Sequence, residues 1–497
     1  MDRKSNTLYC TDLPTTPVPD AGIVLVTGAG GYIGGRLVPE LLARGYRVRV
    51  MVRRYSDEYL DRWPDAELVI ADALNVGQLK IVLKDVTVAY YLIHSMMIGR
   101  KEFAASDLQA VTNFRFAAGE MGLKRIIYLG ALGETGQPLS PHLESRINVA
   151  RILEMGQVPA TILQAGIIIG SGSASFEILD GIVRNIPFYF IPRWARTKCQ
   201  PIGIRDVIKY LVGVLETPET AGKTFDIGCD DVLSYKEMIQ VMVKLLRKRR
   251  LFLPAVTANI RVYSYFISLF SPVPAQIIAC LLESVKHEVV VQEFAIRKHI
   301  DFPTIKFRVA LLRALSREEQ DDIATRWSDA YPPAHELAIK LGELGRPPKY
   351  ISTFSTLTRT TPSGIYRNVC RIGGKQGWFH MNWMWRLRGR IDRILMGVGT
   401  SRGRRDAIQL RINDVVDFWR VEDLVRNKRL LLRAEMRVPG RAWLEFIITE
   451  TKGMNKLSIT AYFQPRGLAG RLYWYFFLPF HFFIFRDLLR QLTRESR

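Results

Sequence analysis

The chain has 497 residues, which is too long for a single hydrophobic core, so we expect two or three domains. Its 48% hydrophobic and 24% charged residues exclude a disordered protein. The net charge of +22 favours anionic partners such as lipid or acidic ligands, and without a recognisable nucleic-acid-binding module we predict no nucleic acid among them.

Residues 1–20 contain no apolar segment, so we expect a short disordered lead-in and no signal peptide. The five cysteines are odd in number and far apart, which excludes a C-x-x-C zinc site and fits a reducing cytosol. The seven histidines form no H-x-x-x-H spacing or His/carboxylate cluster, so we predict no metal.

A glycine-rich stretch, TGAGGYIGGRLV at residues 27–38, follows the apolar strand pattern IVLVT. Glycines can form a tight turn, admit a pyrophosphate and let a helix lie close to a strand. The start of the following helix offers amide donors and a positive dipole end to phosphates. This context predicts a dinucleotide site formed by Thr27, Gly28, Gly31, Tyr32, Ile33 and Gly34.

Strand patterns alternate with single helices from residue 22 to about 170. Such an order implies right-handed crossovers and a doubly wound parallel sheet. We therefore assign an α/β Rossmann domain to residues 21–230. Strands are expected at residues 23–27, 47–52, 67–71, 88–93, 125–130 and 161–166.

The second expected strand ends with Val52, Arg53 and Arg54, where an NAD site usually carries an acidic residue for the ribose 2′-hydroxyl. Two guanidinium groups suit a 2′-phosphate instead, so we predict NADP(H) in preference to NAD(H). The alternative is that both arginines are solvated loop charges.

Residues 231–345 mix helices and loops, and we expect a helical cap and a linker there. In an enzyme of this shape such a region covers the crevice at the carboxyl ends of the strands and shapes the substrate site. Phe176, Glu177, Arg193 and Trp194 are expected to line that cleft, although a tryptophan there could equally belong to the core.

A period-two alternation begins near residue 365 and predicts an antiparallel meander followed by a long terminal helix. The longest apolar run, residues 472–485, is shorter than the ~20 residues a spanning helix needs. We expect it to be buried or to lie in a membrane interface.

Most of the excess positive charge lies near the C-terminus, where residues 361–497 hold 26 Lys and Arg against 11 Asp and Glu. The densest basic segment, Arg386 to Arg405, adjoins the aromatic stretch WFHMNWMW. A solvated face is the default interpretation, and a lipid or acidic-ligand surface is the alternative.

Several segments resemble known families. VTGAGGYIGGRLV, VMVRR, ADAL, YYLIHSM and KRIIYLGAL together resemble an atypical or extended short-chain dehydrogenase/reductase of the YbjT type, related to the nucleotide-binding accessory subunit of respiratory complex I. Residues 346–497 resemble the domain fused to that reductase, which is similar to START-like helix-grip folds. The resemblance implies a Rossmann domain with a cap, followed by an α+β START-like domain that binds an apolar ligand.

The resemblance also implies further contacts. It places Asp72 and Ala73 beside the adenine, and Leu92, Ile93 and His94 beside the nicotinamide ribose.

The catalytic residues that the resemblance implies are missing. The standard enzymes carry Ser or Thr after the fifth strand and Tyr-x-x-x-Lys on the next helix, whereas this chain has LGAL, and His142 and Arg146 at the i, i+4 spacing. We hypothesise that His142 donates the proton and that Arg146 binds the ribose, with His94 as a second candidate. In the alternative, both histidines are structural.

Our first interpretation is an NADP(H)-dependent oxidoreductase acting on an apolar substrate such as an isoprenoid, quinone or lipid. The missing Ser, Tyr and Lys favour a second one, a non-catalytic NADP(H)-binding sensor or assembly factor. A third is a peripheral lipid-binding carrier. We expect a cytoplasmic protein, or one peripheral to the inner face of the membrane.

Overall fold

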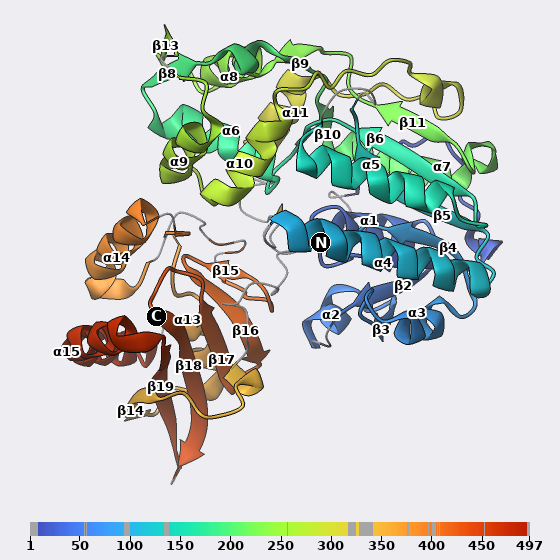
Figure 1. Cartoon of the computed structure of the whole chain (residues 1–497). Coiled ribbons are helices and arrows are strands. Elements are labelled where there is room, and N and C mark those ends of the chain that lie inside the picture. The colour runs from blue at the N-terminus through green and yellow to red at the C-terminus, as the bar shows by residue number, and fades with distance from the viewer. Residues whose placement is uncertain are drawn as a thin grey trace. The chain divides into compact units, whose positions relative to one another are not determined.

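The computed structural model contains two compact units, Met1–Phe270 with Gln276–Tyr331, and Ser271–Ala275 with Pro332–Arg497 (Figure 1). The first unit holds both the predicted Rossmann range and most of the predicted cap, so the boundaries at residues 230 and 345 stay predictions. The structure describes residues 8–53, 55, 57–93, 100–133, 139–255, 257–316, 325–327, 341–374, 377–395, 397–399, 404, 406, 408–451 and 453–494.

A seven-stranded parallel sheet forms the centre of the first unit, in the order β11-β6-β5-β4-β1-β2-β3 (Figure 1). The strand order reverses between β1 and β4, and in open α/β sheets ligands bind in the crevice at such a switch point. The predicted doubly wound Rossmann sheet is confirmed. Its strands are β1 (Ile23–Thr27), β2 (Arg47–Val52), β3 (Glu67–Ile70), β4 (Val86–Tyr91), β5 (Arg125–Ala131), β6 (Ala160–Ala165) and β11 (Thr224–Ile227).

Helices cover both faces of this sheet because its strands are apolar on both sides. One core cluster packs α1 and α7 on one face, and another packs α3, α4 and α5 on the opposite face. A short helix, α2, connects β2 and β3. The helices are α1 (Gly34–Ala43), α2 (Asp57–Arg62), α3 (Val76–Leu83), α4 (Arg100–Glu120), α5 (Pro141–Glu154) and α7 (Ile204–Glu216).

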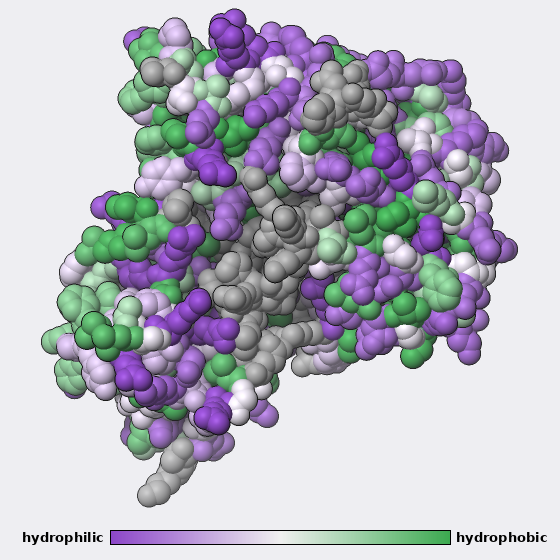
Figure 2. Space-filling model, viewed as in Figure 1, coloured by the Kyte–Doolittle hydropathy of each residue, from purple (hydrophilic) through white to green (hydrophobic). Residues whose placement is uncertain are grey.

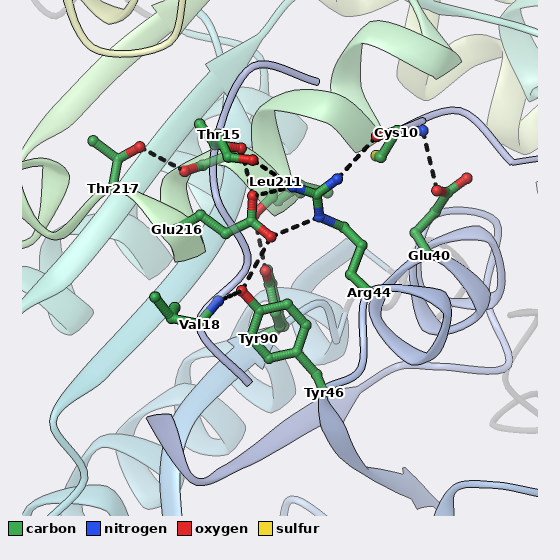
Figure 3. A network of polar contacts seen from close by, with 11 residues as sticks. Cys10, Thr15, Val18, Glu40, Arg44, Tyr46, Tyr90, Leu211, Glu216 and Thr217 are labelled. Atoms are coloured by element: carbon green, nitrogen blue, oxygen red, sulfur yellow. Dashed lines mark hydrogen bonds and ion pairs between the residues drawn. The ribbon is translucent and has the colours of Figure 1, made fainter. Parts of the chain in front are cut away.

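Residues 8–21, here called the N-terminal strap, pack against α1 and α7 (Figure 3). Cys10 is 1% exposed, and the Arg44 guanidinium donates to the carbonyls of Cys10 and Thr15 at 2.9 and 2.7 Å while it pairs with Glu216. The expected disorder of residues 1–20 is therefore wrong for the described part. The strap contains too few apolar residues to show a periodic pattern, and partners distant in sequence fix it.

A smaller lobe completes the first unit around its own core cluster. The predicted cap began at residue 231, but the lobe also uses α6 and β8, which lie within the predicted Rossmann range. The elements are α6 (Ala174–Asn185), β8 (Phe188–Ile191), α8 (Tyr235–Leu245), β13 (Leu251–Pro254), α9 (Ile260–Phe270), α10 (Ala275–Ser284) and α11 (Phe307–Ala314). In addition, two pairs of short strands are present: β7 (Ile168–Ile169) pairs with β10 (Ile202–Gly203), and β9 (Lys198–Cys199) pairs with β12 (Leu233–Ser234).

The second unit contains a six-stranded antiparallel sheet in the order β14-β19-β18-β17-β16-β15. The predicted meander is present, and β14 is an additional edge strand in a segment we expected to be partly linker. Its strands are β14 (Tyr350–Thr358), β15 (Val415–Val416), β16 (Trp419–Val425), β17 (Arg429–Ala434), β18 (Gly440–Thr451) and β19 (Met454–Pro465).

Within the described residues, three α-helices accompany this sheet: α13 (Pro362–Val369), α14 (Asn382–Ile394) and α15 (Gly467–Leu492). The long helix α15 was predicted, and it packs on β14 and β19 through Phe485 and Leu488. Helix α14 was not predicted as an element. The START-like relationship of this unit stays a prediction.

Candidate functional site

The glycine-rich turn connects β1 to α1 at the switch point of the parallel sheet. Gly28 has a φ of +65°, and a Cβ on it would lie 2.5 Å from the carbonyl oxygen of Leu92. A Cβ on Gly34 would lie 2.6 Å from the carbonyl oxygen of Gly28. No side chain caps the start of α1 at Ile33. A glycine-rich turn before an uncapped helix start fits the pyrophosphate of a dinucleotide.

Thr27 closes the gap between the ends of β1 and β4. Its buried hydroxyl donates to the Tyr90 carbonyl at 2.9 Å and accepts from the Leu92 amide at 3.0 Å. Both hydrogen bonds of the hydroxyl go to residues at the end of β4. The predicted contact of Thr27 with the cofactor would therefore be made by its backbone.

Leu92 and Ile93 follow β4 and are half-buried beside the glycine turn. Their implied contact with the nicotinamide ribose stays a prediction. His94, the second catalytic candidate, lies outside the described residues.

Arg53 is exposed directly after β2, and Arg54 lies outside the described residues. The sequence analysis missed Arg62 on α2, whose guanidinium lies 2.3 Å from a Cβ built on Gly35 and 4.5 Å from the ring of Trp63. Arg62 therefore brings a positive charge to the first turn of α1. The sequence offered one signal for Arg62, namely that a third arginine follows soon after Arg53 and Arg54.

The loop after β3 is fixed by hydrogen bonds from within the domain. The exposed Asp72 carboxylate accepts from the Leu74 amide at 3.0 Å. The carbonyl of buried Ala73 accepts from the Asn113 side chain of α4 at 3.2 Å. Asp72 and Ala73 are thus held in a defined turn at the strand end where the family resemblance places the adenine.

Arg36 is a second residue that the sequence analysis missed. It is 7% exposed, and it donates to the carbonyls of Thr325 and Ser171 at 2.9 and 2.8 Å. Its guanidinium also lies 4.2 Å from the centre of the Tyr32 ring. Because these carbonyls occupy the guanidinium, Arg36 is a positioning residue that fastens residues 325–327 to the first turn of α1.

Helix α5 carries the two catalytic candidates. The Ser140 hydroxyl caps the helix by accepting from the Leu143 amide at 3.3 Å. Arg146 donates to the Tyr128 hydroxyl of β5 at 3.2 Å, and burial raises the pKa of Tyr128. His142, one turn earlier, is half-buried. The Arg146 side chain therefore reaches toward β5.

Two regions of the chain match known protein families. Residues 20–295, more than half of the chain, match the NmrA-like family. The chain belongs to the NmrA-like family. This membership confirms an NAD(P)-binding Rossmann domain of the short-chain dehydrogenase/reductase type. Residues 347–488 match a second family, described as a protein of unknown function (DUF2867).

The relatives of the NmrA-like region include a subunit of an enzyme complex, a reductase and an assembly factor. Subunit 9 of the NADH dehydrogenase [ubiquinone] 1 alpha subcomplex from Dictyostelium discoideum is 23% identical over 44% of this chain and 63% of that protein. Divinyl chlorophyllide a 8-vinyl-reductase from Cucumis sativus is 22% identical over 45% and 57%. The photosystem II assembly factor Ycf39 from Trieres chinensis is 21% identical over 41% and 63%. The chain thus spans less than two thirds of each relative.

Among solved structures, the Bordetella bronchiseptica enzyme WbmG in complex with NAD is 15% identical, with a TM-score of 0.48. The alignment covers 62% of this chain and 96% of that one.

Two expected cleft residues of the NmrA-like region belong instead to the packing of the smaller lobe. Phe176 is 2% exposed within the core cluster of that lobe. The Trp194 indole donates to the Ala258 carbonyl at 3.1 Å and packs against the Tyr263 ring. Burial raises the pKa of Glu177, and Arg193 is exposed. Apolar residues on a helix face cannot be assigned to cleft or core from sequence alone.

Proposed function

We propose that this protein is an NADP(H)-dependent oxidoreductase that acts on an apolar substrate such as an isoprenoid, quinone or lipid. The observation that supports the proposal is the glycine-rich turn at Gly28, which lies against the end of β4. Its backbone amides would bind a pyrophosphate, and Leu92 and Ile93, which follow β4 beside the turn, would contact the nicotinamide ribose.

The arginines after β2 support the preference for NADP(H). Arg53 is exposed, and Arg62 lies at the first turn of α1. Guanidinium groups form charge-assisted bonds with a 2′-phosphate, whereas a ribose hydroxyl pair calls for a carboxylate acceptor. Together with Arg54, these residues would bind the adenosine end.

Bound NADPH would supply a hydride to the substrate. In this proposal His142 holds the proton that the reduced substrate takes up, since an imidazole titrates near neutral pH. The hydrogen bond from Arg146 to Tyr128 gives Arg146 a supporting role, holding α5 against β5.

Titration of the full chain with NADPH and NADH tests the cofactor. We expect NADPH to bind more tightly, and Arg53→Ala combined with Arg54→Ala to weaken NADPH binding by about tenfold or more while NADH binding changes little. Arg193→Ala with Arg196→Ala removes two exposed arginines of the same unit and serves as the control. Equal affinities in the native chain, or an unchanged preference in the double variant, would contradict the NADP(H) assignment.

A non-catalytic NADP(H) sensor or assembly factor is the second candidate. Two observations favour it. Strand β5 ends without a residue that carries a hydroxyl group, and the Arg146 side chain forms a hydrogen bond with Tyr128. Oxidation of NADPH in the presence of lipid extract distinguishes the two functions. Turnover supports the enzyme, whereas tight binding without turnover in any extract supports the sensor.

A further inference from the structure

Helix α14 buries Trp385 in the core of the second unit but exposes four other apolar side chains. Its Asp392 is 0% exposed, and the carboxylate accepts from the amides of Arg437 and Gly399 at 2.6 and 2.8 Å. The inner face of the helix thus carries Trp385 and a hydrogen-bonded carboxylate, and the apolar stripe on the outer face is additional to the face that covers the core. Packing within the unit therefore does not explain the stripe. It consists of Trp383, Leu387, Ile391 and Ile394, which are 61, 49, 44 and 63% exposed.

Helix α15 has a second exposed apolar stripe on the side opposite its core contacts. Its inner face carries Trp474, Phe485 and Leu488, which are at most 6% exposed. Six exposed leucine and aromatic residues form this stripe, and helical spacing brings them onto one face. Five of the six lie within the apolar run at residues 472–485. These residues are Leu468, Leu472, Tyr475, Phe476, Phe482 and Phe483, with exposures between 45 and 70%.

The two helices are joined by direct contacts. The Arg388 guanidinium of α14 lies 5.8 Å from the centre of the Tyr473 ring of α15. His380, just before α14, is 3.0 Å from the Asp487 carboxylate of α15. In Figure 2, hydrophobic residues gather over both helices among hydrophilic ones.

Exposed arginines flank both stripes, namely Arg386, Arg390, Arg471, Arg486 and Arg490. The acidic residues of these two helices are Asp392, which is buried, and Asp487, whose side chain is 14% exposed. The surface that comprises the two stripes and the five arginines, here called the apolar–arginine face, is thus both hydrophobic and strongly positive.

We propose that the apolar–arginine face docks on the surface of an anionic lipid bilayer. Aromatic and leucine side chains would enter the boundary between headgroups and acyl chains, and the arginines would contact lipid phosphates. No helix within the described residues is long and apolar enough to cross a bilayer, so the two helices lie in the interface.

Charge favours lipid over a second copy of this chain. A symmetric dimer through this face would place the same arginines against one another, and like charges oppose such an interface. A bilayer containing anionic lipid supplies the complementary charge. The inference uses none of the nucleotide-site residues and does not rest on the proposed oxidoreductase activity.

Flotation of the full chain with vesicles tests the proposal. One set contains phosphatidylcholine alone, and the other contains phosphatidylcholine mixed with phosphatidylglycerol. We expect the chain to float with the mixed vesicles, to bind the neutral ones at least about tenfold more weakly, and to be released as salt is raised.

Two sets of variants separate the apolar and electrostatic contributions. Leu472→Ser, Phe476→Ser and Phe483→Ser together should weaken binding to mixed vesicles by about tenfold or more. The matched control, Ile81→Ser, Met155→Ser and Leu312→Ser, changes three exposed apolar residues of the first unit and should bind like the native chain. Arg386→Glu with Arg390→Glu should also weaken binding, whereas Arg193→Glu with Arg196→Glu should not.

Circular dichroism and the thermal midpoint establish that each variant is folded, which is expected because the substituted side chains face solvent. No binding of the native chain to mixed vesicles would overturn the proposal. Full binding by the folded serine variant would also overturn it. A native dimer in sedimentation that the serine variant dissociates, without lipid binding, would assign the face to self-association instead.

Discussion

At the scale of single residues, Gly28 is the position where a substitution most directly tests the nucleotide site. Its φ of +65° and the 2.5 Å between a Cβ and the Leu92 carbonyl leave no space for a methyl group. We expect Gly28→Ala to abolish measurable NADPH binding in a titration and to lower the free energy of unfolding by about 1–3 kcal/mol.

Gly119→Ala is the matched control for this change. A Cβ there would lie 3.8 Å from the side chain of Gln157, which follows α5, and this is an ordinary van der Waals contact. NADPH affinity should stay at the native value, and the helix should gain up to about 1 kcal/mol of stability. NADPH binding by folded Gly28→Ala protein would remove the basis of the proposed site.

His142 is the residue on which the proposed proton transfer depends. If it donates the proton, His142→Ala should lower NADPH turnover by about a hundredfold while NADPH affinity is retained. The comparison of steady-state rates with binding titrations separates the two effects. Unchanged turnover would leave His142 as a structural residue of the half-buried start of α5.

Residues were predictable from sequence where the backbone itself imposes a chemical requirement. Gly28 and Gly34 were found because only glycine fits these close approaches. Arg36 and Arg62 were missed because their roles depend on tertiary neighbours that no local spacing reveals. Thr27 was assigned to the cofactor, but its hydroxyl is used between two strands.

At the scale of elements, the N-terminal strap lies against a buried ion pair between Arg44 at the end of α1 and Glu216 of α7 (Figure 3). The Arg44 guanidinium also donates to strap carbonyls. Arg44 and Glu216 are 2.7 Å apart, and the Tyr46 hydroxyl donates to the same carboxylate at 3.0 Å. Glu216→Gln leaves the Arg44 charge buried without its counter-ion, so we expect a loss of about 3–5 kcal/mol in urea unfolding.

The control for this variant is Glu293→Gln, which removes an exposed ion pair with Lys298. Exposed pairs contribute little, so its unfolding curve should coincide with that of the native chain. A Glu216→Gln curve that also coincides would show that the buried ion pair contributes no net stability.

His481 makes the stability of the second unit dependent on pH. Burial beside Trp474 and Phe485 lowers its pKa from 6.5 to about 4. The unfolded chain therefore binds the proton first, and the free energy of unfolding falls by up to about 3 kcal/mol as the pH drops from about 7 to about 4.

His481→Leu should remove this part of the pH dependence while keeping a side chain of similar volume. Urea unfolding of the native chain and the variant across that pH range, followed by tryptophan fluorescence, gives the difference. If the free energy of unfolding changed with pH in the same way in both proteins, His481 would be excluded as the origin of the pH dependence.

Elements were predictable where hydrophobic periodicity is strong. The buried strands of the parallel sheet show continuous apolar runs, and β16 to β19 show clear alternation. Strand β14 was missed because its half-exposed edge sequence is rich in Ser and Thr. Helix α14 was missed because its apolar stripe is interleaved with arginines, which made the segment resemble a solvated surface.

At the scale of the whole molecule, each unit has its own hydrophobic core. The core clusters of the first unit include residues of α1, α4 and α8, and a separate cluster forms the core of the second unit. Separate cores predict two transitions in calorimetry. NADPH at about a hundred times its dissociation constant should add roughly 2.7 kcal/mol to the first unit and raise only that midpoint by a few degrees. A single transition, or a shift of both midpoints, would contradict this prediction.

The attachment of Thr325 by Arg36 has a consequence for communication along the chain. Residue 325 is among the last described residues before the second unit in sequence, and its side chain touches the turn that begins α1. A nucleotide that stiffens that turn would therefore also hold residue 325 in place. One guanidinium thus links occupancy of the nucleotide site to a segment 289 residues further along the chain.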